Sequence, residues 1–212
     1  MSCPPSVRRT FPCLTFSAML AAACLPPPVS AAAQGAELRR GARIALVVAD
    51  DTQPRARMAV DDLASFLQRS LGAVVRRYPA GGAVLSRIEE DACLVFGPGE
   101  GNPAASRLAG EAGVALATGD LGTEGSLVRS ASIAGKPVVF LTGKTLAGAC
   151  HAAYSFLERE LGIGFFIDGN RVPELAAVGL AGLDRRESPA VPIRGIFYHP
   201  TWKHPHATSW RL

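Results

Sequence analysis

The last stretch of the sequence holds the residue types best suited to binding a small polar ligand. Both tryptophans and three of the four histidines lie between positions 198 and 210. Aromatic rings can cover the apolar faces of sugar rings, while polar side chains bind the sugar hydroxyls. The residues of this cluster are Tyr198, His199, Trp202, His204, His206 and Trp210. We expect sugar contacts from His199, Trp202, His204 and Trp210, and a purely structural role for the segment is the alternative.

The histidines of this cluster do not predict a metal centre. His199, His204 and His206 have no Cys, Asp or Glu among them to complete a ligand set. The sequence therefore predicts no metal ion, and no motif in it calls for another cofactor.

Hydrolysis of a glycosidic bond needs two carboxyl groups about 5–10 Å apart. The acidic clusters of the sequence are Asp50–Asp51 and Glu89–Asp91. Side chains that are neighbours along a strand point in different directions, so neither cluster forms such a pair. Both indicate solvated charge at strand ends, and we predict no catalytic residue in this chain.

Two glycine-containing turns resemble phosphate-binding loops without matching them. Gly143–Thr145 lies between an expected strand and an expected helix, but the phosphate loop requires a glycine where Val138 stands. Gly97–Gly101 lacks the spacing of the dinucleotide fingerprint, and Pro98 has no amide hydrogen to donate. We interpret both segments as turns.

Strands and helices alternate along the chain and must position these residues. Apolar runs and periodic apolar stripes predict strands at 43–49, 73–78, 92–96, 127–134, 137–142 and 163–167, and helices at 54–71, 104–112 and 145–161. Gly135-Lys136 is expected to join two of the strands as a hairpin. This order predicts an α/β fold, a two-layer sandwich with a mixed sheet.

The first residues have the three parts of an export signal. Arg8 and Arg9 precede an uncharged, largely apolar run at 11–25, and prolines and small residues follow it. The run is too short to remain as a membrane span. We therefore expect a signal peptide at 1–33 and a periplasmic or extracellular protein. Leu20–Cys24 resembles a lipoprotein signal with its Leu one position too far away, so lipidation stays open.

The charges and the cysteines of the sequence argue against nucleic-acid binding and against a disulfide. Two of the 22 basic residues and none of the 18 acidic residues precede Gln34, so the expected mature chain has a formal charge of +2. No stripe of Lys and Arg with interleaved aromatics predicts nucleic-acid binding. Cys93 and Cys150 fall in apolar patterns, which favours buried thiols over a disulfide.

Two segments carry a resemblance to known enzymes. Leu146–Phe166, followed by Val172-Pro173, resembles the last helix and strand of the non-catalytic N-terminal domain of α-glucuronidases and β-N-acetylhexosaminidases. Pro192–Phe197, with Arg194-Gly195, is similar to the first strand of the (β/α)8 barrel that follows this domain in those families. The resemblance implies an accessory domain at 40–170, a linker at 171–192 and the truncated start of a barrel at 193–212.

The resemblance also implies a function. The chain is expected to be the non-catalytic N-terminal part of an exported, α-glucuronidase-like hydrolase of polysaccharides, and to meet its carbohydrate through the attached barrel. Arg194 becomes a candidate sugar contact, although relatives usually place an Asp where this sequence has His199. A periplasmic carbohydrate-binding module without catalysis is the alternative.

Overall fold

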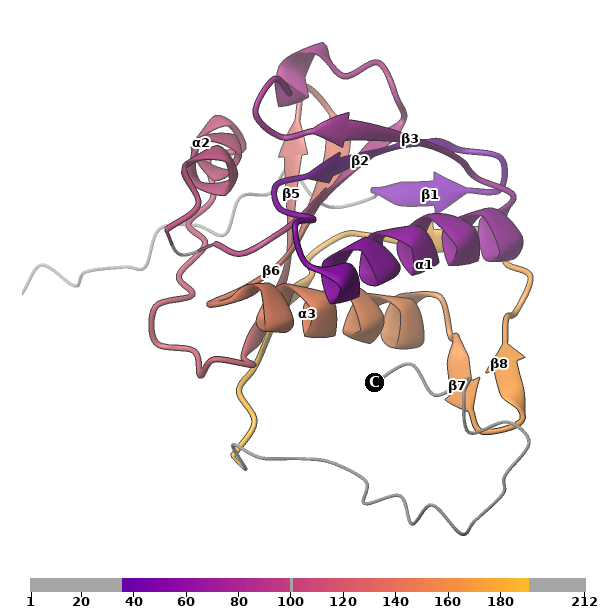
Figure 1. Cartoon of the computed structure of the whole chain (residues 1–212). Coiled ribbons are helices and arrows are strands. Elements are labelled where there is room, and N and C mark those ends of the chain that lie inside the picture. Colours follow the sequence, from indigo (N-terminus) through magenta and orange to yellow (C-terminus); the bar gives the residue numbers. More distant parts are fainter. Residues whose placement is uncertain (1–35, 100, 191–212) are drawn as a thin grey trace, which may run out of the picture.

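The computed structural model describes residues 36–99 and 101–190. Its centre is a sheet of six strands (Figure 1). In spatial order these strands are β10 (Asp184–Glu187), β5 (Ser126–Ile133), β6 (Lys136–Gly143), β4 (Ala92–Phe96), β2 (Arg43–Val48) and β3 (Val74–Pro79). Strands β3, β2, β4 and β6 are parallel, whereas β5 is antiparallel to β6 and β10 is antiparallel to β5. The sheet is therefore mixed.

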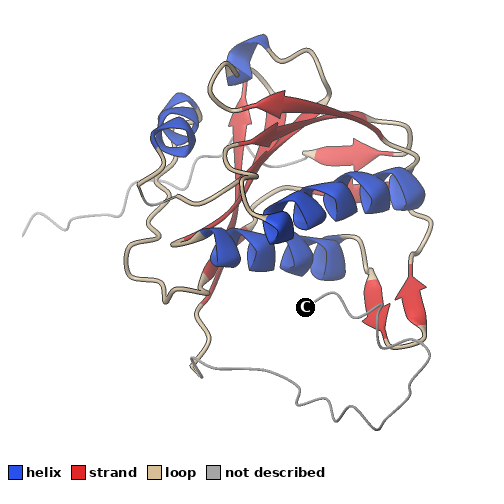
Figure 2. Ribbon diagram, viewed as in Figure 1, coloured by secondary structure: helices blue, strands red, loops and turns tan. Residues whose placement is uncertain are grey.

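Helices cover the sheet unequally. The two long helices, α1 (Pro54–Leu71) and α3 (Leu146–Glu160), lie side by side on one face (Figure 2). The shorter α2 (Pro103–Glu111) and the 3₁₀ turn η2 (Leu85–Arg87) cover part of the other face. The α/β sandwich with a mixed sheet that the sequence predicts is confirmed.

Alternating side chains of the central strands build two apolar cores. Ile44 and Leu46 of β2 pack in the core beneath α1 and α3, whereas Ala45 and Val47 pack in the core beneath α2. Successive residues of a strand point to opposite faces, so a run that is apolar throughout predicts a strand covered on both sides. All four of these side chains are fully buried.

The apolar stripes predicted for the two long helices are buried as expected. On α1 the stripe consists of Val60, Leu63, Leu67 and Leu71, and on α3 of Leu146, Cys150, Ala153 and Leu157, with Leu161 just beyond its end. Gly72 ends α1 in the left-handed conformation, with φ of 63°, which glycine adopts without steric cost.

Capping residues determine where α2 and α3 begin. The side-chain oxygen of Asn102 accepts hydrogen bonds from the amides of Ala104 and Ala105, and Pro103 takes the first position of α2. At the start of α3, the Thr145 hydroxyl accepts from the amide of Gly148 and donates to the carbonyl of Thr123.

The stretch expected to be a linker contains regular structure. Strand β9 (Ala177–Gly179) pairs with β1 (Glu37–Arg39), and β10 adds an edge to the main sheet. Before it, β7 (Gly164–Phe166) and β8 (Gly169–Arg171) form a separate hairpin. These strands have three or four residues each, which is too short for an alternating apolar pattern to show in the sequence.

The turn between β5 and β6 lies one residue earlier than predicted. Ala134 and Gly135 both have positive φ, of 49° and 79°, and Lys136 already belongs to β6. Two successive residues with positive φ match the twist of a two-residue hairpin, and Gly135 takes the second position without strain. The expected hairpin is confirmed, with Ala134 in place of Lys136 in the turn.

Helix α3 begins in close contact with the sheet through glycines. A side-chain carbon at Gly148 would overlap the carbonyl oxygen of Gly125 and lie 3.1 Å from Cα of Gly143. These neighbours are backbone atoms that cannot rotate away, so the first turn of α3 approaches β6 and the loop before β5 only because position 148 has no side chain.

We expect Gly148→Ala to lower the free energy of unfolding by about 2–3 kcal/mol, the usual cost of overpacking a rigid site. Gly110→Ala is the matched control, because Gly110 also lies in a helix but an added carbon there meets nothing within 4 Å. That control should be stabilising by about 0.5–1 kcal/mol through helix propensity. Urea unfolding of both variants measures the difference, and equal stability would show that the close contact is absent.

Candidate functional site

The residues predicted to contact a sugar lie outside the described residues. They are Arg194, His199, Trp202, His204 and Trp210. The expected signal peptide at 1–33 and the expected barrel start at 193–212 lie outside them too. A candidate site within the described residues must therefore be built from other side chains.

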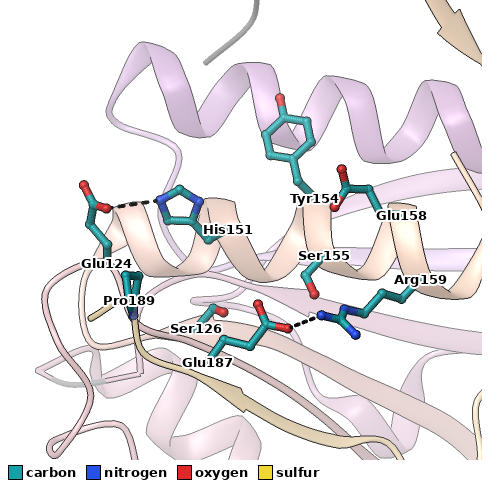
Figure 3. Close-up of a pocket in the computed structure, with 9 residues that line it drawn as sticks. All are labelled: Glu124, Ser126, His151, Tyr154, Ser155, Glu158, Arg159, Glu187 and Pro189. Carbon is teal, nitrogen blue, oxygen red and sulfur yellow. Dashed lines mark ion pairs between the residues drawn. The ribbon is translucent and has the colours of Figure 1, made fainter. Parts of the chain in front are cut away.

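A polar groove runs along the outer flank of α3, beside the edge strand β10 (Figure 3). Its volume is about 290 Å³. Helix α3 contributes most of the lining, and the rest comes from the loop before β5, from β5 and from the chain at and after β10. The lining residues are Glu124, Ser126, His151, Tyr154, Ser155, Glu158, Arg159, Glu187 and Pro189.

A basic and an acidic side chain lie next to each other at each end of the groove. His151 Nε2 lies 3.9 Å from Glu124 Oε2, and Arg159 Nη2 lies 3.0 Å from Glu187 Oε1 (Figure 3). Glu158, on the exposed surface of α3, forms no ion pair within the described residues. The groove lining therefore has three carboxylates and one arginine, which makes it acidic.

The carboxylates of the groove are not arranged for acid–base hydrolysis. A general acid must stay protonated near neutral pH, which requires burial or a second, unpaired carboxylate close by. The side chains of Glu124 and Glu187 are 39% and 43% exposed, and each has a basic partner. Such an arrangement suits binding of positive charge or of hydroxyl groups.

The inner side of α3 is fixed by polar and aromatic contacts. The Tyr154 hydroxyl lies 2.8 Å from Oδ2 of Asp62, a buried carboxylate on α1, and in Figure 3 its ring points toward α1. Phe165 of β7 packs edge-on against both Tyr154 and Phe66, with ring centroids 5.5 Å apart in each pair. Helix α3, α1 and the β7–β8 hairpin are thereby joined.

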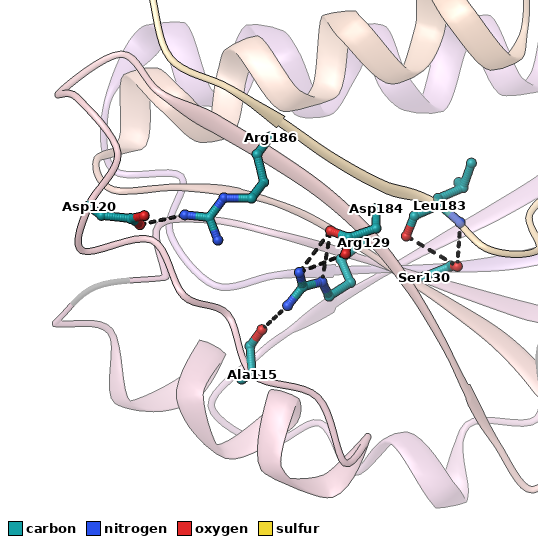
Figure 4. Close-up of polar contacts among 7 residues, drawn as sticks. All are labelled: Ala115, Asp120, Arg129, Ser130, Leu183, Asp184 and Arg186. Atoms are coloured by element: carbon teal, nitrogen blue, oxygen red, sulfur yellow. Dashed lines mark hydrogen bonds and ion pairs between the residues drawn. The ribbon is translucent and has the colours of Figure 1, made fainter. Parts of the chain in front are cut away.

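Strand β10 is fixed to β5 by charged contacts on its outer face (Figure 4). Arg129 of β5 donates three hydrogen bonds to Asp184, at 2.7, 3.0 and 3.2 Å, and a fourth to the carbonyl of Ala115. Arg186 pairs with Asp120 in the preceding loop. These contacts position Glu187 and Pro189, which form one wall of the groove.

In the described residues, the two glycine-containing turns make internal contacts and do not form a phosphate-binding loop. The Lys144 ammonium donates to the carbonyl of Gly119 at 3.1 Å, and the Gly143 carbonyl accepts from the amide of Gly99. Gly97 has φ of 146°, and a side chain there would collide with Ala49. The backbone of these segments is engaged in packing, which agrees with their interpretation as turns.

The acidic clusters have structural roles. Asp50 accepts from the amide and hydroxyl of Thr52, which fixes the turn into α1. Burial alone would raise the pKa of Glu90, but the hydrogen bond from Tyr78 and the charge of Arg76 hold it below its ordinary value.

Asp91 fastens the start of β2. Its Oδ2 accepts from the backbone amide of Arg43 at 2.8 Å, and its Oδ1 lies 3.3 Å from the Arg43 guanidinium. The amide hydrogen bond, more than any other contact, lowers the pKa of Asp91. Because a depressed pKa means that folding favours the ionised form, this contact stabilises the fold above the unfolded pKa.

The cysteines are buried free thiols, as predicted. Cys93 lies in the core beneath α2 and Cys150 in the core beneath α3, on opposite faces of the sheet. Burial raises the pKa of Cys93 to about 12 and that of Cys150 to about 11. Neither thiol is therefore an effective nucleophile near neutral pH.

Within the described ranges, no group of three or more His, Cys, Asp or Glu is placed to hold a metal ion. The helices of those same ranges include none with the length and apolar character needed to cross a bilayer.

Comparison with known proteins gives a likeness in structure and none in sequence. Neither a scan against protein families nor a search of curated proteins finds a match to the sequence. The fold is similar to part of a solved structure described as a novel family GH115 4-O-methyl-α-glucuronidase, BtGH115A, with specificity for decorated arabinogalactans. The TM-score is 0.54 at 20% identity, and the match covers 74% of this chain and 19% of that one. The likeness establishes the fold.

The groove was not predicted from the sequence. Its residues come from three segments that are distant along the chain, and one of them, the stretch around β10, was expected to be a linker. His151 lies exposed on α3. The pairing of His151 with Glu124 depends on the loop before β5, which has no periodic pattern.

We expect Asp91→Asn to lower the free energy of unfolding by about 1 kcal/mol at pH 7, because a charge-assisted hydrogen bond becomes a neutral one. The difference should shrink as the pH falls below about 4, the ordinary pKa of an unfolded Asp, and vanish once the native carboxyl is protonated. Urea unfolding at several pH values measures it. Glu89→Gln, an exposed neighbour, should show neither effect; a pH-independent cost for Asp91→Asn would contradict this assignment.

Proposed function

We propose that this chain is the non-catalytic N-terminal domain of an exported, α-glucuronidase-like glycoside hydrolase. The observation that carries the proposal is the likeness of its fold to a fifth of a 4-O-methyl-α-glucuronidase, a much longer protein. That likeness agrees with the independent resemblance of Leu146–Phe166 and Pro192–Phe197 to the same class of enzymes.

The contacts of the described residues support an accessory role. The segment that carries the first resemblance forms α3 and β7, whose side chains fill the core and fasten the hairpin to α1. The task of this segment is packing, because the residues of α3 that face inward are apolar and buried. The exposure of the groove carboxylates, two of which have basic partners, favours the same conclusion.

In this proposal, residues 193–212 begin the catalytic barrel of the longer polypeptide. A loop after a first barrel strand opens on the active-site face. Arg194, His199, Trp202, His204 and Trp210 then contact the sugar at that face. The two catalytic carboxyl groups come from later barrel strands, and the signal peptide at 1–33 directs the protein out of the cytoplasm.

A carbohydrate-binding module without catalysis is the second candidate. It is favoured by the concentration of both tryptophans in one short segment, because exposed aromatic rings are the usual platform for sugars.

The 212-residue chain should release no glucuronic acid from 4-nitrophenyl α-glucuronide or from oligosaccharides that carry 4-O-methylglucuronate. The polypeptide encoded by the full reading frame should release it from at least one of them. Reducing-sugar and chromatographic assays measure both, and circular dichroism verifies that the shorter chain is folded. Turnover by the 212-residue chain, or a folded full-length product with no glycosidase activity, would contradict the proposal.

The two candidates differ in sugar affinity. A binding module should bind oligosaccharides as the 212-residue chain, and Trp202→Ala should weaken that binding by about tenfold or more, the value of one aromatic stacking contact at a buried site. The accessory domain should show no measurable affinity before or after the substitution. Isothermal titration calorimetry with acidic and neutral oligosaccharides distinguishes them.

A further inference from the structure

We propose that residues 184–190 form a releasable strap at the edge of the sheet. Strand β10 makes up most of this strap. While it is attached, the strap covers the edge of β5 and supplies one wall of the groove, through Glu187 and Pro189. When the ionic strength rises, it detaches as a unit and opens both. The strap goes beyond the proposed function and does not depend on it, because all of its contacts lie within the described residues.

Apart from its backbone hydrogen bonds to β5, strand β10 is attached by charge. None of its four side chains is apolar, and none is buried. Each forms an ion pair with another element of the fold, and the partners of Asp184, Arg185, Arg186 and Glu187 are, in that order, Arg129, Glu160, Asp120 and Arg159. Salt screens contacts of this kind, but it does not weaken apolar packing.

Attachment of the strap leaves two buried donors of Arg185 unused. Its Nη1 lies 2.5 Å from Oε1 of Glu160, whereas its Nε and Nη2 are buried and have no hydrogen-bond partner within the described residues. A buried donor without a partner lowers the stability of the state that buries it, and release of the strap exposes both groups to water. The balance between attachment and release is therefore close enough for salt to shift it.

Leu183 is the fixed end of the strap (Figure 4). Its side chain packs against the core beneath α1 and α3. Its carbonyl accepts a hydrogen bond from the amide of Ser130, and its own amide donates to the Ser130 hydroxyl at 2.9 Å. Leu180, three residues earlier, is fully buried. Release therefore begins after Leu183, and the chain up to that residue stays in place.

The opposite edge of the sheet is attached differently. Strand β3 also has two ion pairs, through Arg76 and Arg77, but all six of its residues are in register with β2. Its Val75 and Tyr78 pack against the two apolar cores. Screening of the charges leaves these contacts unchanged, so β3 stays attached under conditions that release the strap and serves as an internal control.

Hydrogen exchange measures the release. Alternate residue pairs of an antiparallel ladder exchange hydrogen bonds, and the Ser130 amide bonds the Leu183 carbonyl, so the amides of Arg185 and Glu187 also face β5. Mass spectrometry of the full 212-residue chain at constant pH compares about 0.1 M with about 1 M NaCl, which shortens the Debye length from about 10 Å to about 3 Å. We expect these two amides to exchange about tenfold faster or more at the higher salt, and the amides of β3 less than about twofold faster.

Asp184→Asn should mimic the effect of salt at a single contact. It replaces the charged partner of Arg129 by a neutral group of the same shape. Exchange of the Arg185 and Glu187 amides in about 0.1 M NaCl should rise about threefold, as expected for the loss of one partly exposed ion pair. Asp61→Asn is the matched control, because it removes an ion pair of the same length, 2.7 Å, from a similarly exposed carboxylate at the opposite edge. It should leave the exchange of β10 unchanged.

Three results would overturn the proposal. Exchange of β10 that does not respond to salt would show that the backbone bonds alone hold the strand. Equal acceleration in β10 and β3 would indicate loosening of the whole fold in place of release of a strap. An equal effect of Asp61→Asn and Asp184→Asn on β10 would exclude the contact with Arg129 as its attachment. Circular dichroism verifies that each variant is folded at both salt concentrations.

Discussion

The close approach of α3 to the sheet is the constraint on which the other features depend. Gly148 lets the first turn of the helix touch the backbone at Gly125 and Gly143, and Thr145 caps it at the same point. From this anchored start the helix lies flat over β5 and β6, so its apolar stripe fills the core beside α1. The opposite flank of the same helix is left at the surface, where it becomes one wall of the groove. A helix held further from the sheet would bury less apolar surface and would separate that flank from β10.

Sequence analysis succeeds here where a single element contains the whole signal. The stripe of α1 ending at Gly72 and the apolar run of β4 each satisfy a periodic rule within one segment, and both are found where predicted. It fails where pairing partners are distant. β1 and β9 have three residues each, and their central partners, Leu38 and Val178, are 140 positions apart in the sequence. β10 reads Asp-Arg-Arg-Glu, which has no apolar face at all, and is a strand because Arg129 and the backbone of β5 hold it.

The groove could not be predicted for the same physical reason. Its acidic character results from Glu124, Glu158 and Glu187, which belong to a loop, a helix and an edge strand. None of the three is unusual in its local sequence, and only the packing of α3 against the edge of the sheet brings them to one surface. Because these side chains are exposed, solvent weakens the electrostatic fields of their charges. Such a surface is suited to holding charged groups in position.

The charged edge strand limits where a partner can bind. An open strand edge can pair with another strand, and proteins commonly prevent this with charged residues. On β10, Arg185 pairs with Glu160 at 2.5 Å and Arg186 pairs with Asp120. Successive side chains of a strand point to opposite faces, so the strand has an ion pair on each face of the sheet. Addition of a further strand would have to desolvate these ion pairs, which is costly. Contact through the flank of α3 leaves these ion pairs intact, so a partner meets a lower desolvation cost at the groove than at the neighbouring sheet edge.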